Sequence, residues 1–306
     1  MTGHLWKLAL VVALSHGYRV VGRSIGPRWA GLITALPCST AISLLGGGSD
    51  RGVDYAVAMA DACWVGLAGA SALPLAFASA TVAGWGWVRS VLLAVLAYFA
   101  VMVGVGSLAH WSGGNFPIAV LALMVATFQA SRIPEPSPSP RSKSRSFSAA
   151  QVFWLRTAVP AACLMMVIVL GERMGPSVAG CLGTFPGVTL TALLLTRLEA
   201  GPVPAVRMAR ALPPGNWAMV AFLATFMLTA PRTGVVGGTA LGYLSALVCL
   251  GTVARLTNPP MLTRLRGLIQ ARRRQLRPER ATKINAGPAW PRTPRRFSPL
   301  VEPIIA

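Results

Sequence analysis

Two apolar segments of this chain are each interrupted by a proline that hydroxyl side chains follow closely. A proline inside a helix removes one backbone hydrogen bond and leaves a carbonyl oxygen without its partner. That carbonyl and the nearby hydroxyls can bind the polar groups of a solute or a dehydrated Na⁺ ion. Alternatively, the hydroxyls bond to the preceding turn of their own helix, and the segments simply pack closely against small residues. The candidate substrate-binding residues are Pro37, Ser39 and Thr40 in the first segment, and Pro186, Thr189 and Thr191 in the second.

Asp61 is the one acidic residue that lies well inside an apolar segment. A carboxylate within a membrane costs about 2.5–3.5 kcal/mol, so it usually has a function or a partner. Asp61 is therefore a candidate for coupling transport to protons or Na⁺. The alternative is that it lies close enough to the outer face to be solvated.

The sequence contains no recognisable catalytic constellation. No Ser-His-Asp set, acidic pair within a span, Gly-rich nucleotide loop or Walker motif occurs. The five cysteines are odd in number and form no Cys-x-x-Cys pair, and the three histidines lack ligand spacing. We expect no catalytic residues, no metal, no cofactor and no enzymatic activity.

The composition is typical of a membrane protein. The chain is 54% hydrophobic and only 12% charged, with a mean hydropathy of +0.59. Most of its apolar blocks are long enough to cross a bilayer as helices. No alternating strands are evident, so the predicted fold class is all-α, a polytopic helical membrane protein. The nine predicted spans are 5–21, 30–46, 57–82, 87–109, 115–131, 152–171, 178–196, 214–230 and 234–255.

The second half of the chain repeats the first at an offset of 149 residues. From Gly22 and Gly171 to Ala62 and Ala211 the alignment has no gap, and 15 of its 41 pairs are identical. About four identities would be expected by chance in such a composition. The first span resembles a secretory signal, but it occupies the place that the sixth span takes in the second copy, which favours a true span.

The basic loops predict an N-terminus outside and a C-terminus in the cytoplasm. Five spans separate equivalent positions, so the two repeats enter the membrane in opposite directions, as in many secondary transporters. The predicted regions are a first repeat of five spans at 1–131, a cytoplasmic Ser/Pro-rich linker at 132–150, a second, inverted repeat of four spans at 151–256, and a basic cytoplasmic tail at 257–306.

The tail holds much of the net charge of +20, because 12 of the 28 Lys and Arg lie beyond residue 254. An apolar stripe with arginines on the other faces predicts an interfacial helix against anionic lipids, followed by a disordered segment. A plain cationic topology anchor is the alternative. The predicted partners are the lipid bilayer, anionic lipids at the tail and a small-molecule or ion substrate, with no nucleic acid; homo-oligomer formation is left open.

The stretch Gly26-Pro-Arg-Trp-Ala-Gly-Leu-Ile-Thr-Ala-Leu-Pro-Cys-Ser-Thr40 resembles a motif of uncharacterised bacterial multi-span inner-membrane proteins. Those proteins read roughly Gly-Pro-x-x-Gly-Gly-Leu-x-Ala-x-Leu-Pro-Ser-Thr and are transporter-like. The resemblance covers about forty residues of each half, and the second copy departs from it at Gly187-Val188, where the Ser is missing. It implies a transporter fold and carries no substrate.

These features predict a secondary transporter that moves a small solute across the bacterial inner membrane by alternating access between two inverted repeats. Since no ATP-binding motif occurs, energy would come from an ion gradient or a partner subunit. The alternative is a non-transporting membrane scaffold or assembly protein that acts through its basic C-terminal tail.

Overall fold

The computed structural model describes residues 27–112, 114–135 and 173–257, with scattered short runs between 154 and 170. The predicted span at 5–21, most of the span at 152–171, most of the linker and nearly all of the tail lie outside the described residues. By its internal contacts the chain divides into two units, Met1–Leu256 and Thr257–Ala306. The described helices belong to the first unit, apart from the last residue of α11.

Every element in the described residues is a helix, which confirms the all-α class. Within the described ranges, five helical stretches are long and apolar enough to cross a membrane: Gly31–Arg51, Val53–Val82, Trp87–Trp111, Pro176–Ala200 and Pro202–Leu256. Apolar helices of this length indicate a membrane protein. The helices are α2 (Pro27–Thr34), α3 (Cys38–Arg51), α4 (Val53–Val82), α5 (Trp87–Ser112), α6 (Asn115–Arg132), α8 (Pro176–Gly183), α9 (Gly187–Ala200), α10 (Pro202–Gly215) and α11 (Trp217–Thr257).

The helix boundaries repeat with the same offset of 149 residues as the sequence. Shifting α2 by that offset gives the bounds of α8, and shifting α3 gives those of α9. The turns before α4 and α10 also correspond, with a φ of 92° at Gly52 and of 95° at Gly201. Glycine adopts such a φ without strain, so both copies use the same turn. The duplication is therefore present in the backbone as well as in the residues.

The helical stretch that contains the predicted span at 214–230 begins before that span. Helix α10 already starts at Pro202, and its apolar face is buried, with Ala205, Val206 and Ala209 fully inaccessible. Four prolines and two arginines lower the hydropathy of this stretch, which conceals the buried face in a hydropathy-based reading. Helix α10 therefore begins at the position equivalent to the start of α4.

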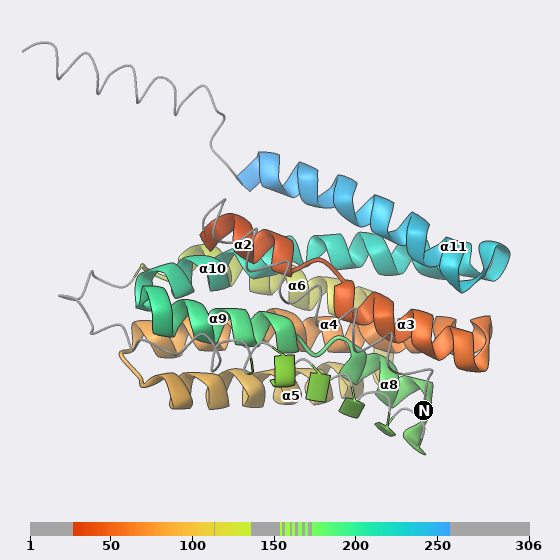
Figure 1. The fold of residues 1–306 in the computed structure, drawn as a ribbon, viewed down its shortest axis with the longest axis horizontal. Coiled ribbons are helices and arrows are strands. Elements are labelled where there is room, and N and C mark those ends of the chain that lie inside the picture. The colour runs from red at the N-terminus through yellow and green to blue at the C-terminus, as the bar shows by residue number, and fades with distance from the viewer. Residues whose placement is uncertain are drawn as a thin grey trace, which may run out of the picture. The chain divides into compact units, whose positions relative to one another are not determined.

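Helix α11 consists of two arms joined at Gly234, where a φ of 76° interrupts the helix. The arms cover the predicted spans 214–230 and 234–255, and they fold back on each other (Figure 1). Gly242 lies against Phe222, and Ser245 Oγ donates to the Ala221 carbonyl oxygen at 3.0 Å. Small residues and hydroxyls of this kind allow two membrane helices to approach closely.

The first half-helix of each repeat packs against the other repeat. Helix α2 lies on α10, and α8 lies on α4. A Cβ added to Gly31 would overlap the Met208 carbonyl, and a Cβ added to Gly180 would overlap the Met59 carbonyl. The two glycines are equivalent positions, and so are the two methionines. The same contact thus occurs twice with the repeats exchanged, which interlocks the two copies.

Helices α5, α6 and α11 expose large apolar side chains, whereas α4 lies inside the bundle. Helix α4 is largely buried, with Leu67 and Phe77 fully inaccessible. An apolar surface of this extent suits contact with lipid rather than water. The exposed large apolar side chains include Leu92, Leu96, Val103 and Leu108 on α5, Leu121, Met124 and Phe128 on α6, and Leu244, Leu247 and Val248 on α11.

Candidate substrate-binding site

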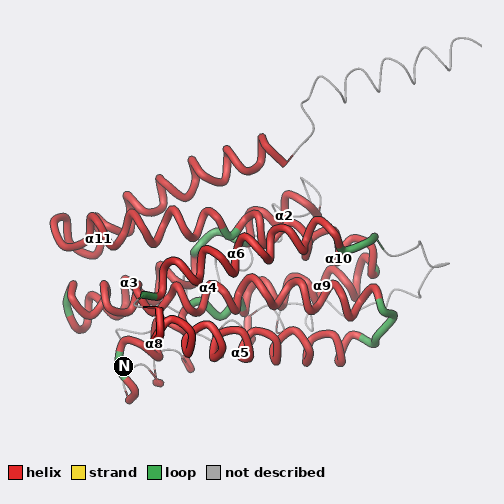
Figure 2. Tube along the Cα trace, turned by 180° about the vertical axis from the view of Figure 1, so that it is seen from behind, coloured by secondary structure: helices red, strands yellow, loops and turns green. Residues whose placement is uncertain are grey.

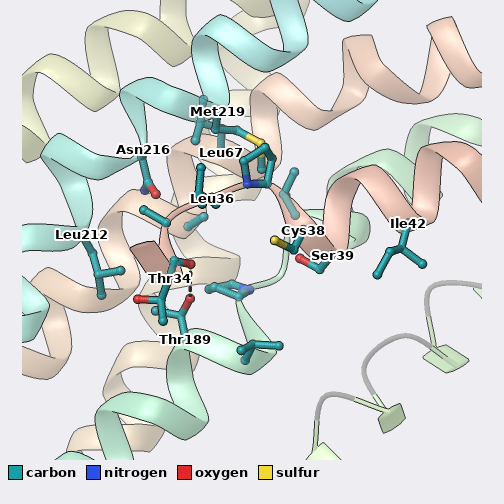
Figure 3. A pocket seen from close by; sticks show the side chains of 16 residues that line it. Thr34, Leu36, Cys38, Ser39, Ile42, Leu67, Thr189, Leu212, Asn216 and Met219 are labelled. Carbon is teal, nitrogen blue, oxygen red and sulfur yellow. Dashed lines mark hydrogen bonds between the residues drawn. The ribbon is translucent and has the colours of Figure 1, made fainter. Parts of the chain in front are cut away.

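The two helix breaks lie on opposite sides of one pocket (Figure 3). One break separates α2 from α3, and the other separates α8 from α9. The pocket has a volume of about 50 Å³, several times the space that one water molecule needs. Its lining includes Thr34, Pro37, Ser39, Pro186, Thr189 and Asn216.

The backbone turns in the same way at both prolines. Pro37 has φ −75° and ψ 43°, and Pro186 has φ −84° and ψ 59°. Each proline carbonyl accepts a hydrogen bond from the amide four residues further on, Ala41 or Leu190, at 2.8 Å. The predicted interruptions at Pro37 and Pro186 are thus confirmed, and each divides an apolar stretch into two half-helices.

The last carbonyl of each first half-helix is paired with a threonine of the other repeat. Thr40 Oγ1 donates to the Gly183 carbonyl oxygen, and Thr189 Oγ1 donates to the Thr34 carbonyl oxygen, both at 3.3 Å. Figure 3 shows the second of these bonds as a dashed line. Thr40 and Thr189 are equivalent positions, as are Thr34 and Gly183. The two hydroxyls therefore join the repeats instead of bonding within their own helices.

The remaining predicted hydroxyls differ from each other. Ser39 lines the pocket, and its side chain makes no hydrogen bond to a described residue. Thr191 Oγ1 donates to the Gly187 carbonyl oxygen of its own helix at 2.8 Å and does not line the pocket. The structure thus brings Pro37, Ser39, Pro186 and Thr189 together at the pocket, places Thr40 beside them, and leaves Thr191 in the body of α9.

Asn216 is a pocket residue that the sequence analysis missed. It lies between α10 and α11, at the position equivalent to Leu67, which also lines the pocket. Its Nδ2 donates to Ser71 Oγ at 3.0 Å, and the residue is 7% exposed. The signal that would have found it is a lone amide side chain in an otherwise apolar predicted span.

Tyr98 of α5 supports the second break from outside the pocket. Its hydroxyl donates to the Cys181 carbonyl oxygen at 2.7 Å and lies 3.3 Å from Thr184 Oγ1. The ring is fully buried and meets Phe185 edge-on. Tyr98 therefore anchors the end of α8, a role for which a tyrosine in an apolar span gives no sequence signal.

Asp61 lies away from the pocket, on the exposed part of α4 near the start of α6. Asn115 Nδ2, in the first residue of α6, donates to Asp61 Oδ2 at 2.8 Å. The equivalent residue, Arg210, contacts the other end of the same helix: its Nε donates to the Ala130 carbonyl oxygen at 3.1 Å, and its Nη2 to that of Ser131 at 3.4 Å. The coupling role of Asp61 stays a prediction, and its visible partner is structural.

An exposed ion pair reinforces the end of α6. Arg207 Nη2 lies 2.8 Å from Glu135 Oε2, and Arg210 Nη1 lies 3.7 Å from Glu135 Oε1. The hydrogen bond from Arg207 holds the pKa of Glu135 below its ordinary value. The segment after α6 is thereby tied to α10.

The pocket offers hydroxyl, amide and apolar groups. Among the described residues that line it, none is charged. The described ranges contain no group of three His, Cys, Asp or Glu side chains that could hold a metal ion. No family model, curated protein or solved structure matches the chain.

Proposed function

We propose that the chain is a secondary transporter that carries a small solute across the bacterial inner membrane and has no enzymatic activity. Nine spans form two inverted repeats, with the N-terminus outside and the C-terminus in the cytoplasm. Substrate reaches the pocket between the two broken helices alternately from each side as one repeat moves against the other.

The observation that carries this proposal is the exchanged pair of hydrogen bonds beside the pocket. Thr40 and Thr189 each pair with a carbonyl of the opposite repeat. Contacts that recur with the repeats exchanged are expected where two copies are related by a two-fold axis. In transporters with inverted repeats, broken helices meet at the substrate site in this way.

The directions of the helices support an inverted relation. Helices α2 and α3 run one way and α8 and α9 run the other way (Figure 1, and from behind in Figure 2). In the proposed orientation α2 starts in the cytoplasm and α8 starts outside. The Thr40–Gly183 bond then lies on the outer side of the pocket, and the Thr189–Thr34 bond lies on the cytoplasmic side. One exchanged bond closes each side.

Of these two bonds, opening either side breaks one. An oxygen-to-oxygen distance of 3.3 Å is long for a hydroxyl donor. Hydrogen bonds between membrane helices contribute about 0.6 kcal/mol on average. The pair therefore holds the closed arrangement weakly, which suits a protein that must open to both sides in turn.

Aqueous access to the pocket from the two sides tests the proposal. In a variant without the five native cysteines, a single cysteine replaces Ser39 or Val188, which are equivalent positions that line the pocket. Impermeant thiol reagents are applied to oriented vesicles from one side at a time. We expect both positions to be labelled from both sides. A cysteine at the fully buried Leu44 is the unreactive control.

Labelling from one side only, or from neither side, contradicts alternating access. The prolines would then act only in packing, and the basic C-terminal tail would become the segment to study, as the scaffold alternative requires.

A further inference from the structure

We infer that the pocket takes a small uncharged polar solute, an inference that names the substrate class of the proposed transporter and rests on that function. Its basis is the uncharged character of the described groups that line the pocket and the position of the charged Asp61 outside that lining.

Charge is absent from the described lining. The lining residues are aliphatic, hydroxyl, amide, thiol, thioether and proline side chains. An ion moved from water into such a site loses its hydration, and only a paired opposite charge or a metal-like ligand set compensates for that loss. Asp61 lies outside the lining and is bonded to Asn115. The site therefore favours a neutral ligand over a cation or an anion.

The last carbonyls of α2 and α8, which could serve as ligands of a cation, are already engaged. The Thr34 and Gly183 oxygens each accept a hydrogen bond from a threonine hydroxyl of the other repeat. A cation would have to compete with both bonds and would find no carboxylate among the described lining residues. Na⁺ is thus a poor occupant of this pocket.

Two side chains of the described lining carry a polar atom with no hydrogen-bond partner among the described residues. The Ser39 hydroxyl makes no hydrogen bond to a described residue, and it can both donate and accept. Asn216 uses Nδ2 to bond to Ser71, while its Oδ1 accepts no hydrogen bond from a described residue. A ligand that donates one hydrogen bond to Asn216 and forms another with Ser39 fits these groups.

The rest of the lining sets the size and the apolar part of the ligand. Ile42, Leu67, Leu212 and Met219 surround the polar groups (Figure 3). The volume of about 50 Å³ holds a few water-sized groups. The expected solute is a neutral molecule of a few non-hydrogen atoms, such as a small amide or alcohol.

Protection from thiol labelling tests the substrate class. The reporter is a Val188→Cys variant without native cysteines, which leaves Ser39 and Asn216 intact. The rate of N-ethylmaleimide labelling of the detergent-solubilised protein is measured in the presence of acetamide, acetate or acetamidinium. These three probes have one shape and different charge. We expect acetamide to slow labelling about twofold when its concentration equals its Kd, and the two ions to have no effect.

The inference is overturned if acetate or acetamidinium protects as well as acetamide. It is also overturned if neither acetamide nor the neutral probes urea and glycerol protect. Replacement of Asn216 by Leu, the residue at the equivalent position 67, is expected to abolish protection by acetamide. Asn216→Asp is expected to transfer protection to acetamidinium, because it places a carboxylate in the pocket. Ser107→Ala, on the exposed side of α5, is the matched control and should keep full protection.

This experiment is independent of the test of transport. In detergent there is no membrane to separate two sides, so labelling does not depend on the side from which the pocket opens. Protection by acetamide with one-sided labelling in vesicles would retain the ligand class and reject transport. Two-sided labelling with protection by an ion would retain transport and reject the ligand class.

Discussion

Threonine, proline and glycine positions show at the residue scale why parts of the two copies remained alike and others diverged. Thr40 and Thr189 are identical because each uses its side chain to bond across the interface. Their acceptors, Thr34 and Gly183, differ in side chain because only the backbone carbonyl takes part. Identity between the copies therefore marks positions where the side chain, or its absence, makes the contact.

Removing the two threonine hydroxyls should have opposite effects on access to the pocket. In the proposed orientation, Thr40→Val breaks the bond on the outer side and should favour opening outward, whereas Thr189→Val should favour opening to the cytoplasm. A loss of about 0.6 kcal/mol corresponds to about a threefold change in the ratio of outside to inside labelling of a pocket cysteine. Thr191→Val, which removes a bond within α9, is the control. Shifts in the same direction would refute the two-sided arrangement.

Adding a methyl group to either interlocking glycine should destabilise the protein. Gly31→Ala and Gly180→Ala each place a Cβ against a methionine carbonyl of the other repeat. Overpacking of this kind costs about 1–3 kcal/mol, so the thermal unfolding midpoint in detergent should fall by similar amounts in both variants. Gly104→Ala meets open space on α5 and should leave the midpoint unchanged or raise it slightly. Equal midpoints for all three would show that the copies do not interlock here.

At the scale of elements, α6 explains why equivalent positions carry opposite charges. Asp61 lies at the N-terminal end of α6 and Arg210 at its C-terminal end. A helix carries partial positive charge at its N-terminus and partial negative charge at its C-terminus. Each charge therefore faces the end of α6 that it stabilises, and the pair clamps one helix between the two repeats.

Reversing either charge should weaken this clamp. Asp61→Arg removes the hydrogen bond from Asn115, and Arg210→Asp removes those to the Ala130 and Ser131 carbonyls. Each also places the wrong charge at one end of α6 and should cost about 1–2 kcal/mol of stability. The double exchange should not restore stability, because both charges then face the wrong ends. Denaturation in detergent measures the effect, with Arg89→Gln on the exposed part of α5 as the control. Restoration by the double exchange would show that the two residues act on each other and not through α6.

On the scale of the whole molecule, α6 is the helix for which the second copy has no apolar counterpart. Both Asp61 and Arg210 contact it, and the fully buried Leu123 lies near its middle. Under the proposed inverted relation the copy of a helix so placed would fall on α6 itself. Under that relation a single helix would occupy the position of both copies, which would account for predicted repeats of five and four spans.

The unit Thr257–Ala306 should be dispensable for the pocket. A chain ending at Thr257 keeps every described residue that lines the pocket and every described contact that joins the repeats. We expect it to retain two-sided labelling at Ser39→Cys and Val188→Cys at the rates of the full chain. Loss of labelling in a protein that still unfolds at the same temperature would assign the tail a direct part in opening.

The sequence by itself determined the helical class, the membrane character, the duplication and the two proline breaks. These are local or compositional properties: apolar length, matched residues at a constant offset, and a ring that cannot continue a helix. Nothing in a linear pattern could show that Thr40 would bond to Gly183, because the partner lies 143 residues away in the other copy. Asn216 could have been noted as a lone amide in an apolar predicted span, but only the fold shows that it lies at the pocket.

Only the tertiary structure decided which predicted groups meet. Ser39 lies at the pocket, Thr191 bonds within α9, and Asp61 accepts a hydrogen bond from Asn115 at the start of α6. The physical reason is that a hydroxyl or carboxylate in an apolar segment takes whichever partner is within reach. That reach depends on how the two copies interlock, through close contacts that glycine permits and larger residues prevent.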